Sequence, residues 1–170
     1  MIVKSHLSRK TKMITALFSL IFIIIIGFAI YGVLNHKGTL LWLNLSIIVI
    51  LLSVYIFAFV NQARNLELTD THLIIHTRRK DIEIPLNTID CISDTKGGFK
   101  DQIRVWGING LFGAQGSYYS KIQSKRYEYY VKNYKERIRI DSTNRNYMVS
   151  CENHLEFIET VKQAIAKLNR

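Results

Sequence analysis

Residues 106–120 read WGINGLFGAQGSYYS. Four of the chain's nine glycines stand here at every third position: Gly107, Gly110, Gly113 and Gly116. A collagen strand is excluded because it needs a long proline-rich run, and a phosphate-binding loop is excluded because Gly116 leads into another strand-like run. Glycines within strands mark bulges, bends or close backbone approach. We therefore expect these glycines to bend a β-sheet, with Trp106, Phe112 and Tyr118 packed around the bend; a glycine loop that grips a ligand is the functional alternative.

Two long apolar segments precede this stretch. Neither residues 13–34 nor residues 40–60 contain a charge, and each is long enough to cross a hydrocarbon core of about 30 Å. The short connection, residues 35–39, forces an antiparallel transmembrane hairpin. The first segment is too long for the apolar core of a signal peptide, and no A-x-A-like cleavage site follows it. We expect it to be retained as an anchor.

Basic residues indicate how this hairpin is oriented. Four of them stand in the N-terminal tail, residues 1–12, and Arg64 follows the second segment, whereas the connection carries only Lys37. Basic flanks stay on the cytoplasmic side of a membrane. We therefore expect both termini, and the soluble part of the chain, to lie in the cytoplasm.

The soluble part, residues 61–170, has the length of one compact domain. Apolar and polar residues alternate in short runs such as RIRID at 137–141, which predicts strands. Turn signals, among them Gly97-Gly98, separate about seven such strands. An N-cap and an apolar stripe at helical spacing predict a C-terminal helix over about residues 154–168. The expected fold is a strongly bent set of antiparallel β-sheets, or a partly open barrel, capped by this α-helix.

The order of these segments resembles the bacterial pleckstrin-homology-like (bPH) domains over about residues 103–163. The resemblance rests on a GLFG...G.YY segment, a polar strand pair and a V-S-x-x-N/D-x-x-x-F-I approach to the last helix. The matching positions are Gly110, Leu111, Phe112, Gly113, Gly116, Tyr118, Tyr147, Val149, Ser150, Phe157 and Ile158. It implies a PH-like fold of two nearly orthogonal sheets capped by a helix, often fused to membrane spans, here in a bacterial cytoplasmic (inner) membrane. It implies no activity, because a fold alone does not carry one.

The sequence shows no constellation typical of an enzyme or a metal site. G-x-S-x-G and H-E-x-x-H are absent, and His72 and His76 stand about 13 Å apart along a strand, too far to share one metal ion. Cys91 and Cys151 allow one disulfide, but a reducing cytoplasm favours two plain thiols. We expect no catalysis, no cofactor and no metal.

Two basic clusters are the candidate contacts with a lipid or a partner. The first consists of Arg78, Arg79 and Lys80, and the second contains Lys121, Lys125 and Arg126. Tyrosines interleave with Lys and Arg through residues 121–137, a pattern that suits a solvated hairpin, an anionic lipid or acidic partner, or single-stranded nucleic acid. Of these three, nucleic acid is the least favoured.

The charge balance fits a domain held near an anionic membrane. The residues after Val60 hold 18 of the 23 Lys and Arg and all 13 Asp and Glu, which leaves a net charge of +5. We therefore expect a non-catalytic, membrane-anchored module that binds a protein partner or an anionic membrane surface. The alternative is an accessory subunit of a transport or secretion complex that acts through its transmembrane hairpin.

Overall fold

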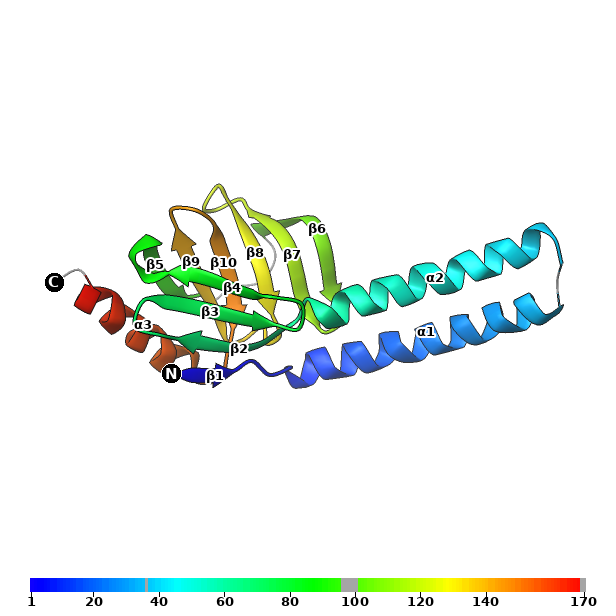
Figure 1. Ribbon diagram of the computed structural model, residues 1–170, viewed down its shortest axis with the longest axis horizontal. Helices are drawn as coiled ribbons and strands as arrows, with labels where there is room; N and C mark the ends of the chain where they lie inside the picture. The colour runs from blue at the N-terminus through cyan, green and yellow to red at the C-terminus, as the bar shows by residue number, and fades with distance from the viewer. Residues whose placement is uncertain (36, 96–100, 169–170) are drawn as a thin grey trace.

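In the computed structural model, residues 1–35, 37–95 and 101–168 are described, so the predicted Gly97-Gly98 turn lies outside the described residues. Two long helices, α1 (Arg9–Asn35) and α2 (Thr39–Val60), project side by side from a β-rich domain (Figure 1). At 1.5 Å per residue the 22 residues of α2 extend about 33 Å. Both helices are therefore long and apolar enough to cross a membrane.

The domain consists of two open sheets and a C-terminal helix, α3 (His154–Leu168). The four-stranded sheet has the order β1-β2-β3-β4, with β1 (Ile2–Lys4), β2 (Ala63–Leu68), β3 (His72–Thr77) and β4 (Asp81–Pro85). The six-stranded sheet has the order β5-β9-β10-β8-β7-β6, with β5 (Ile89–Asp94), β6 (Gln102–Gly110), β7 (Gly113–Ser120), β8 (Lys125–Val131), β9 (Arg137–Ser142) and β10 (Asn146–Ser150). A short 3₁₀ helix, η1 (Leu86–Thr88), links the two sheets.

These elements confirm the predicted fold class, with two differences. The two sheets are open, in keeping with the predicted set of bent sheets, but they hold more strands than the seven or so predicted. In addition, β10 runs parallel to β8, whereas every strand was expected to be antiparallel. The parallel pair arises because the β9–β10 hairpin folds back so that β10 lies between β9 and β8.

The N-terminal segment, predicted as a basic tail, takes part in the fold. Strand β1 pairs with β2, more than sixty residues later in the chain. The amino group of Met1 donates to the carbonyl of Leu68, at 2.7 Å, and the amide of Ser5 donates to the carbonyl of Arg64. The strand before α1 and the strand after α2 therefore lie side by side in the same four-stranded sheet.

The main core fills the space between the two sheets and α3. Fully buried side chains come from each of the three layers: Leu73 and Ile75, Ile138 and Ile140, and Phe157 and Val161. A second buried cluster lies on the other face of the six-stranded sheet, since Met148 belongs to it while its neighbour Val149 belongs to the main core. Tyr118 is part of that second cluster, with its ring centroid 4.2 Å from that of Tyr129.

The glycine-rich stretch forms the hairpin of β6 and β7. Gly107 pairs with Gly116, and Gly110 pairs with Gly113 across the turn. The φ angles of Gly107 and Gly116 are 116° and 111°, values that residues other than glycine rarely adopt. A β-carbon on Gly116 would lie 2.5 Å from the carbonyl oxygen of Trp106. The two backbones approach each other so closely that only glycine fits.

We predict that Gly116→Ala lowers the free energy of unfolding by about 1–3 kcal/mol from backbone strain alone. Gly27→Ala is the matched control, because a β-carbon on Gly27 in α1 meets nothing within 4 Å. That control should change stability by less than about 1 kcal/mol. Thermal unfolding of the full chain in mild detergent, followed by circular dichroism, measures both. Equal unfolding temperatures for the two variants would contradict this account of the glycine pair.

Candidate functional site

The helices meet the domain at the tip of the β6–β7 hairpin. The amide of Phe112 donates to the hydroxyl of Thr15 in α1, at 3.0 Å, and that hydroxyl donates to the carbonyl of Gly110, at 3.4 Å. The side-chain amide of Gln115 donates to the carbonyl of Ala58 in α2, at 2.9 Å. Thr15 and Gln115 are both buried. Polar groups that would otherwise be unpaired therefore fasten the hairpin tip to both helices.

Aromatic side chains cover the same contact. The ring of Phe112 packs edge-on against Tyr55 and Phe59 of α2, with centroid distances of 5.3 and 5.7 Å, and Trp106 lies 6.2 Å from Phe57. Phe112 has a φ of 57°, which a bulky residue rarely adopts and which turns its ring toward the helix. The prediction that Trp106 and Phe112 pack around a bend within the sheet is therefore corrected: both contact α2.

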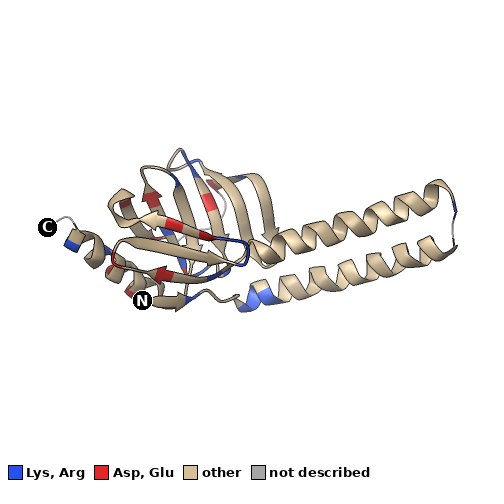
Figure 2. Ribbon diagram, viewed as in Figure 1, with Lys and Arg blue, Asp and Glu red and all other residues tan. Residues whose placement is uncertain are grey.

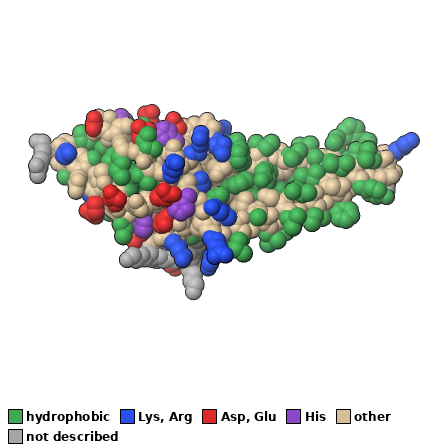
Figure 3. Space-filling model, turned by 90° about the horizontal axis from the view of Figure 1, so that it is seen from below, with side chains coloured by type: hydrophobic (Ala, Val, Ile, Leu, Met, Phe, Trp, Pro, Cys, Tyr) green, Lys and Arg blue, Asp and Glu red, His purple; other side chains and the backbone are tan. Residues whose placement is uncertain are grey.

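Basic residues gather at the domain end of the helices (Figure 2), and their side chains stand out on the face of the junction seen in Figure 3, whereas the connection at the far end carries Lys37. We call them the basic collar, which comprises Arg9, Lys10, Lys12, Arg64, Arg78, Arg79 and Lys80. The guanidinium carbon of Arg78 lies 4.1 Å above the ring of Phe59 at the end of α2. The hydroxyl of Thr77 accepts the amide of Lys80 and donates to its carbonyl, so it shapes the turn that presents Arg78, Arg79 and Lys80.

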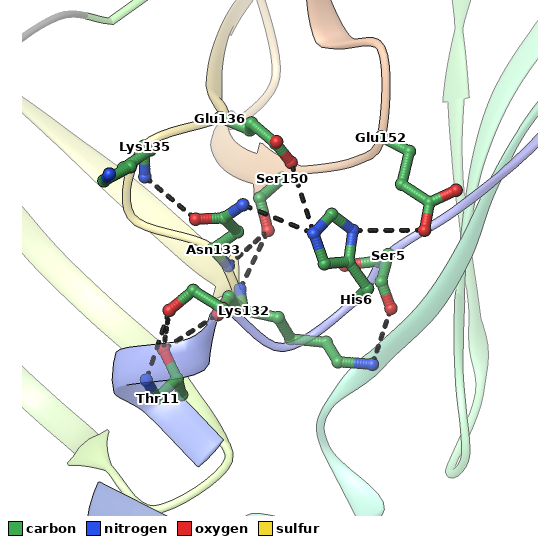
Figure 4. A network of polar contacts seen from close by, with 10 residues as sticks. Ser5, His6, Thr11, Lys132, Asn133, Lys135, Glu136, Ser150 and Glu152 are labelled. Carbon is green, nitrogen blue, oxygen red and sulfur yellow. Dashed lines mark hydrogen bonds and ion pairs between the residues drawn. The ribbon is translucent and has the colours of Figure 1, made fainter. Parts of the chain in front are cut away.

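Lys132 lies close to two cations of the collar, Arg78 and Arg64. Burial first, and then the neighbouring cations Arg78 and Arg64, lower the pKa of Lys132 to about 8. Its ammonium group donates to the carbonyl of Ser5, at 2.7 Å, as Figure 4 shows. The part of this shift that comes from the two arginines reflects their positive charge, which would attract an anion.

A pocket of about 590 Å³ opens beside Lys132, between the start of α1 and the turn from β8 to β9. The residues that line it include four cations: Arg9, Lys10, Lys12 and Lys135. Ser8 caps α1 by accepting the amide of Thr11, whose hydroxyl donates to the carbonyl of Lys132 (Figure 4). On the other side, His6 lies 3.3 Å from a carboxylate oxygen of Glu152. The pocket itself has the charge to hold a phosphate or another anion.

The second predicted cluster lies elsewhere. Lys121, Lys125 and Arg126 stand at the turn from β7 to β8, and β7 begins at the hairpin tip and runs eight residues, or about 23 Å, away from it. Lys125 and Arg126 line a separate cleft of about 500 Å³ together with the acidic residues Asp90 and Glu128. The six predicted contact residues therefore divide equally between the basic collar and the turn from β7 to β8, where two of them line a distal cleft of mixed charge.

The histidine side chains mainly connect elements of the fold. The two ring nitrogens of His76 in β3 lie 2.8 Å from Glu67 of β2 and 2.9 Å from Asp81 of β4. The hydrogen bond to Glu67 raises the pKa of His76, burial opposes this, and Asp81 adds to the rise. Among the described residues, no group of three or more His, Cys, Asp and Glu side chains is arranged to hold a metal ion.

Two residues of the junction escaped the sequence analysis. Thr15 breaks the apolar run of α1, and a polar residue in a membrane segment is itself a signal, because it needs a partner in that environment. Lys132 belongs to the basic stretch 121–137 of the sequence analysis, but its partial burial carried no signal, since it contacts Ser5, 127 residues earlier in the chain. Only the folded chain brings these two segments together.

Comparison with known proteins gives one finding. The family model described as "Bacterial PH domain" matches residues 64–165, which is more than half of the chain and runs from β2 into α3. No curated protein and no solved structure matches the chain significantly. The match confirms the predicted resemblance, and it leaves β1 and the two helices outside the matched segment.

We predict that Thr15→Val, which keeps the shape of the side chain, lowers the free energy of unfolding by about 1–3 kcal/mol. The reason is that the amide of Phe112 and the carbonyl of Gly110 lose their partner at the junction. Thermal unfolding in detergent measures the loss, and faster amide exchange at residues 110–113 locates it. Ser46→Ala is the control, because that hydroxyl bonds to the carbonyl of Trp42 within α2. A Thr15→Val chain as stable as Ser46→Ala would show that these hydrogen bonds do not hold the junction.

Proposed function

The chain belongs to the bacterial PH domain family, and we propose that it is a non-catalytic, membrane-anchored module whose basic collar binds the anionic surface of the bacterial cytoplasmic membrane. PH domains are in general binding modules, which supports a role without catalysis. Two helices of sufficient length and apolar character support the anchoring. The collar supports the choice of an anionic surface as the ligand.

The position of the collar carries this proposal. Arg9, Lys10 and Lys12 stand in the first turns of α1, and Arg78 covers Phe59 in the last turn of α2. With the helices in a bilayer, these cations lie at the level of the phosphate groups. Each basic residue near an anionic leaflet contributes about 1 kcal/mol of attraction. The collar therefore holds the domain against the membrane rather than at the end of a free tether.

The distal cleft is the natural place for a protein partner. It opens at the end of the six-stranded sheet remote from the hairpin tip, and its lining mixes Lys125 and Arg126 with Asp90 and Glu128. A surface with both signs of charge suits a polar protein segment better than a uniformly anionic membrane. The collar and the cleft would then divide membrane and partner binding between them.

The domain is expected to face the cytoplasm, because the collar stands at its end of the helices and only Lys37 stands in the connection. Protease added to inverted membrane vesicles, whose cytoplasmic face is outside, should degrade the domain. Protease added to intact spheroplasts should leave it whole. The reverse pattern of protection would place the domain on the other side and remove the cytoplasmic leaflet as its ligand.

Charge reversal tests the collar against the distal cleft. The full chain in mild detergent is equilibrated with equal amounts of phosphatidylglycerol and phosphatidylcholine, and the lipid that coelutes is quantified. We expect phosphatidylglycerol to be enriched, and the enrichment to fall as salt rises from about 0.05 M to about 0.5 M. The triple change Arg78→Glu, Arg79→Glu, Lys80→Glu should remove on the order of 3 kcal/mol of attraction and most of the enrichment.

The matched control is Lys121→Glu, Lys125→Glu, Arg126→Glu, which alters the net charge by the same amount at the distal turn. This control should retain the enrichment. If both triple variants lose it equally, the attraction comes from net charge and the collar is not a site. If neither loses it, the basic turn at 78–80 is not the contact.

A further inference from the structure

The depth of the hairpin tip relative to the helices points to a second kind of membrane contact. Tyr55 and Phe57, which touch Phe112 and Trp106, stand five and three residues before the end of α2 at Val60. At 1.5 Å per residue these positions lie about 7.5 and 4.5 Å inside the helix end. Because α2 extends only about 33 Å, a hydrocarbon core of about 30 Å takes up nearly all of it. The tip therefore lies at the boundary of the hydrocarbon core.

The backbone at the tip is suited to that depth. Lipid offers no hydrogen bonds, so irregular backbone is tolerated there only where protein groups satisfy it. Thr15 binds the amide of Phe112 and the carbonyl of Gly110, and Gln115 binds the carbonyl of Ala58. These are the polar groups that would otherwise face the acyl chains.

Strand β6 exposes apolar side chains beside this tip. Trp106, Ile103 and Val105 are 52%, 50% and 47% exposed. A bulge between Arg104 and Trp106 places Ile103 opposite Tyr119 and Trp106 opposite Ser117. Tyr119 and Ser117 are alternate residues of β7, so Ile103 and Trp106 point to the same face of the sheet. The bulge thus gathers two large apolar residues that regular pairing would have placed on opposite faces.

β6 is also the edge of its sheet and the strand nearest to the helices, and its last part runs across their direction (Figure 1). An exposed apolar edge strand invites pairing with another chain unless something covers it. Here the apolar surface continues from Trp106 directly onto Phe57 of α2. That continuity selects the bilayer as the cover, because the same lipids that surround α2 reach the edge of the sheet.

We propose that β6 and the tip of the β6–β7 hairpin are embedded in the membrane interface, with Trp106 at the level between headgroups and acyl chains. Tryptophan is enriched at this level because its ring is apolar and its N–H is polar. The inference rests on the proposed anchoring of the helices. It does not depend on the collar, since burial of apolar side chains requires no anionic lipid.

Trp106 is its own reporter, because Trp42, at the opposite end of α2, is the chain's other tryptophan. The full-length Trp42→Phe chain is reconstituted in phosphatidylcholine vesicles that contain lipids with a nitroxide on the headgroup, or near the top or the bottom of an acyl chain. We expect quenching of Trp106 fluorescence to be strongest with the shallow labels. Iodide in the water should quench it weakly.

Two further variants calibrate the measurement. Trp106→Phe leaves Trp42 as a reporter within the hairpin. Ile122→Trp, in a chain that lacks both native tryptophans, places a reporter at a 70% exposed position in the turn from β7 to β8, where iodide but not lipid labels should quench it. Trp106 that behaves like the reporter at position 122 would overturn the proposal. Trp106 shielded from both iodide and lipid labels would also overturn it, by showing a protein cover such as a second copy.

The outcome separates this inference from the proposed binding of anionic lipid. Shallow quenching in pure phosphatidylcholine, retained in the Arg78→Glu, Arg79→Glu, Lys80→Glu chain, supports the embedded strand even if phosphatidylglycerol is not enriched. Quenching that disappears in that triple variant would show that the collar, not the apolar strand, brings Trp106 to the membrane, and would contradict the proposal.

Discussion

The structure depends on a hydroxyl group, that of Thr15, inside an otherwise apolar helix. This hydroxyl, which is buried, pairs with a backbone donor and a backbone acceptor at the tip of the β6–β7 hairpin. Burial of the contact strengthens these bonds, and the aromatic contacts of Phe112 lie beside them. As a result, the orientation of the six-stranded sheet relative to the helices is fixed. The positions of β6 and of the basic collar along the helix axes follow from it.

The glycine hairpin makes this arrangement possible. Gly107 and Gly116 let β6 and β7 approach more closely than side chains permit, and the same hairpin contacts both helices. The same stretch thus has two structural roles. Near its base Tyr118 packs in the buried cluster of the six-stranded sheet, and at its tip Phe112 packs against α2. The family match includes this stretch but neither of the helices it contacts.

Sequence reasoning succeeded where the signal is local. Charge-free runs predict the two helices because hydrocarbon excludes charge, and alternation as in RIRID predicts β9 because one of its faces is buried. It failed where the partner is distant. Strand β1 is only three residues long and pairs with β2, which follows both helices in the chain. Phe112 is plainly apolar in the sequence, but the sequence does not show that it packs against α2. The two basic clusters cannot be told apart from the sequence. In the structure Arg78 of the first lies against the end of α2, whereas the second follows β7, which runs away from the helices.

The pairing of β1 with β2 has a consequence for biogenesis. Residues 2–4 are made before the two helices, whereas their partner strand is made only after both of them. Because the two strands flank the hairpin, they can meet only if its ends emerge on the same side of the membrane. A chain that threads one helix and leaves the other behind has its first strand and its sheet in different compartments. With the helices in a bilayer, the four-stranded sheet could therefore be completed only after both helices had inserted.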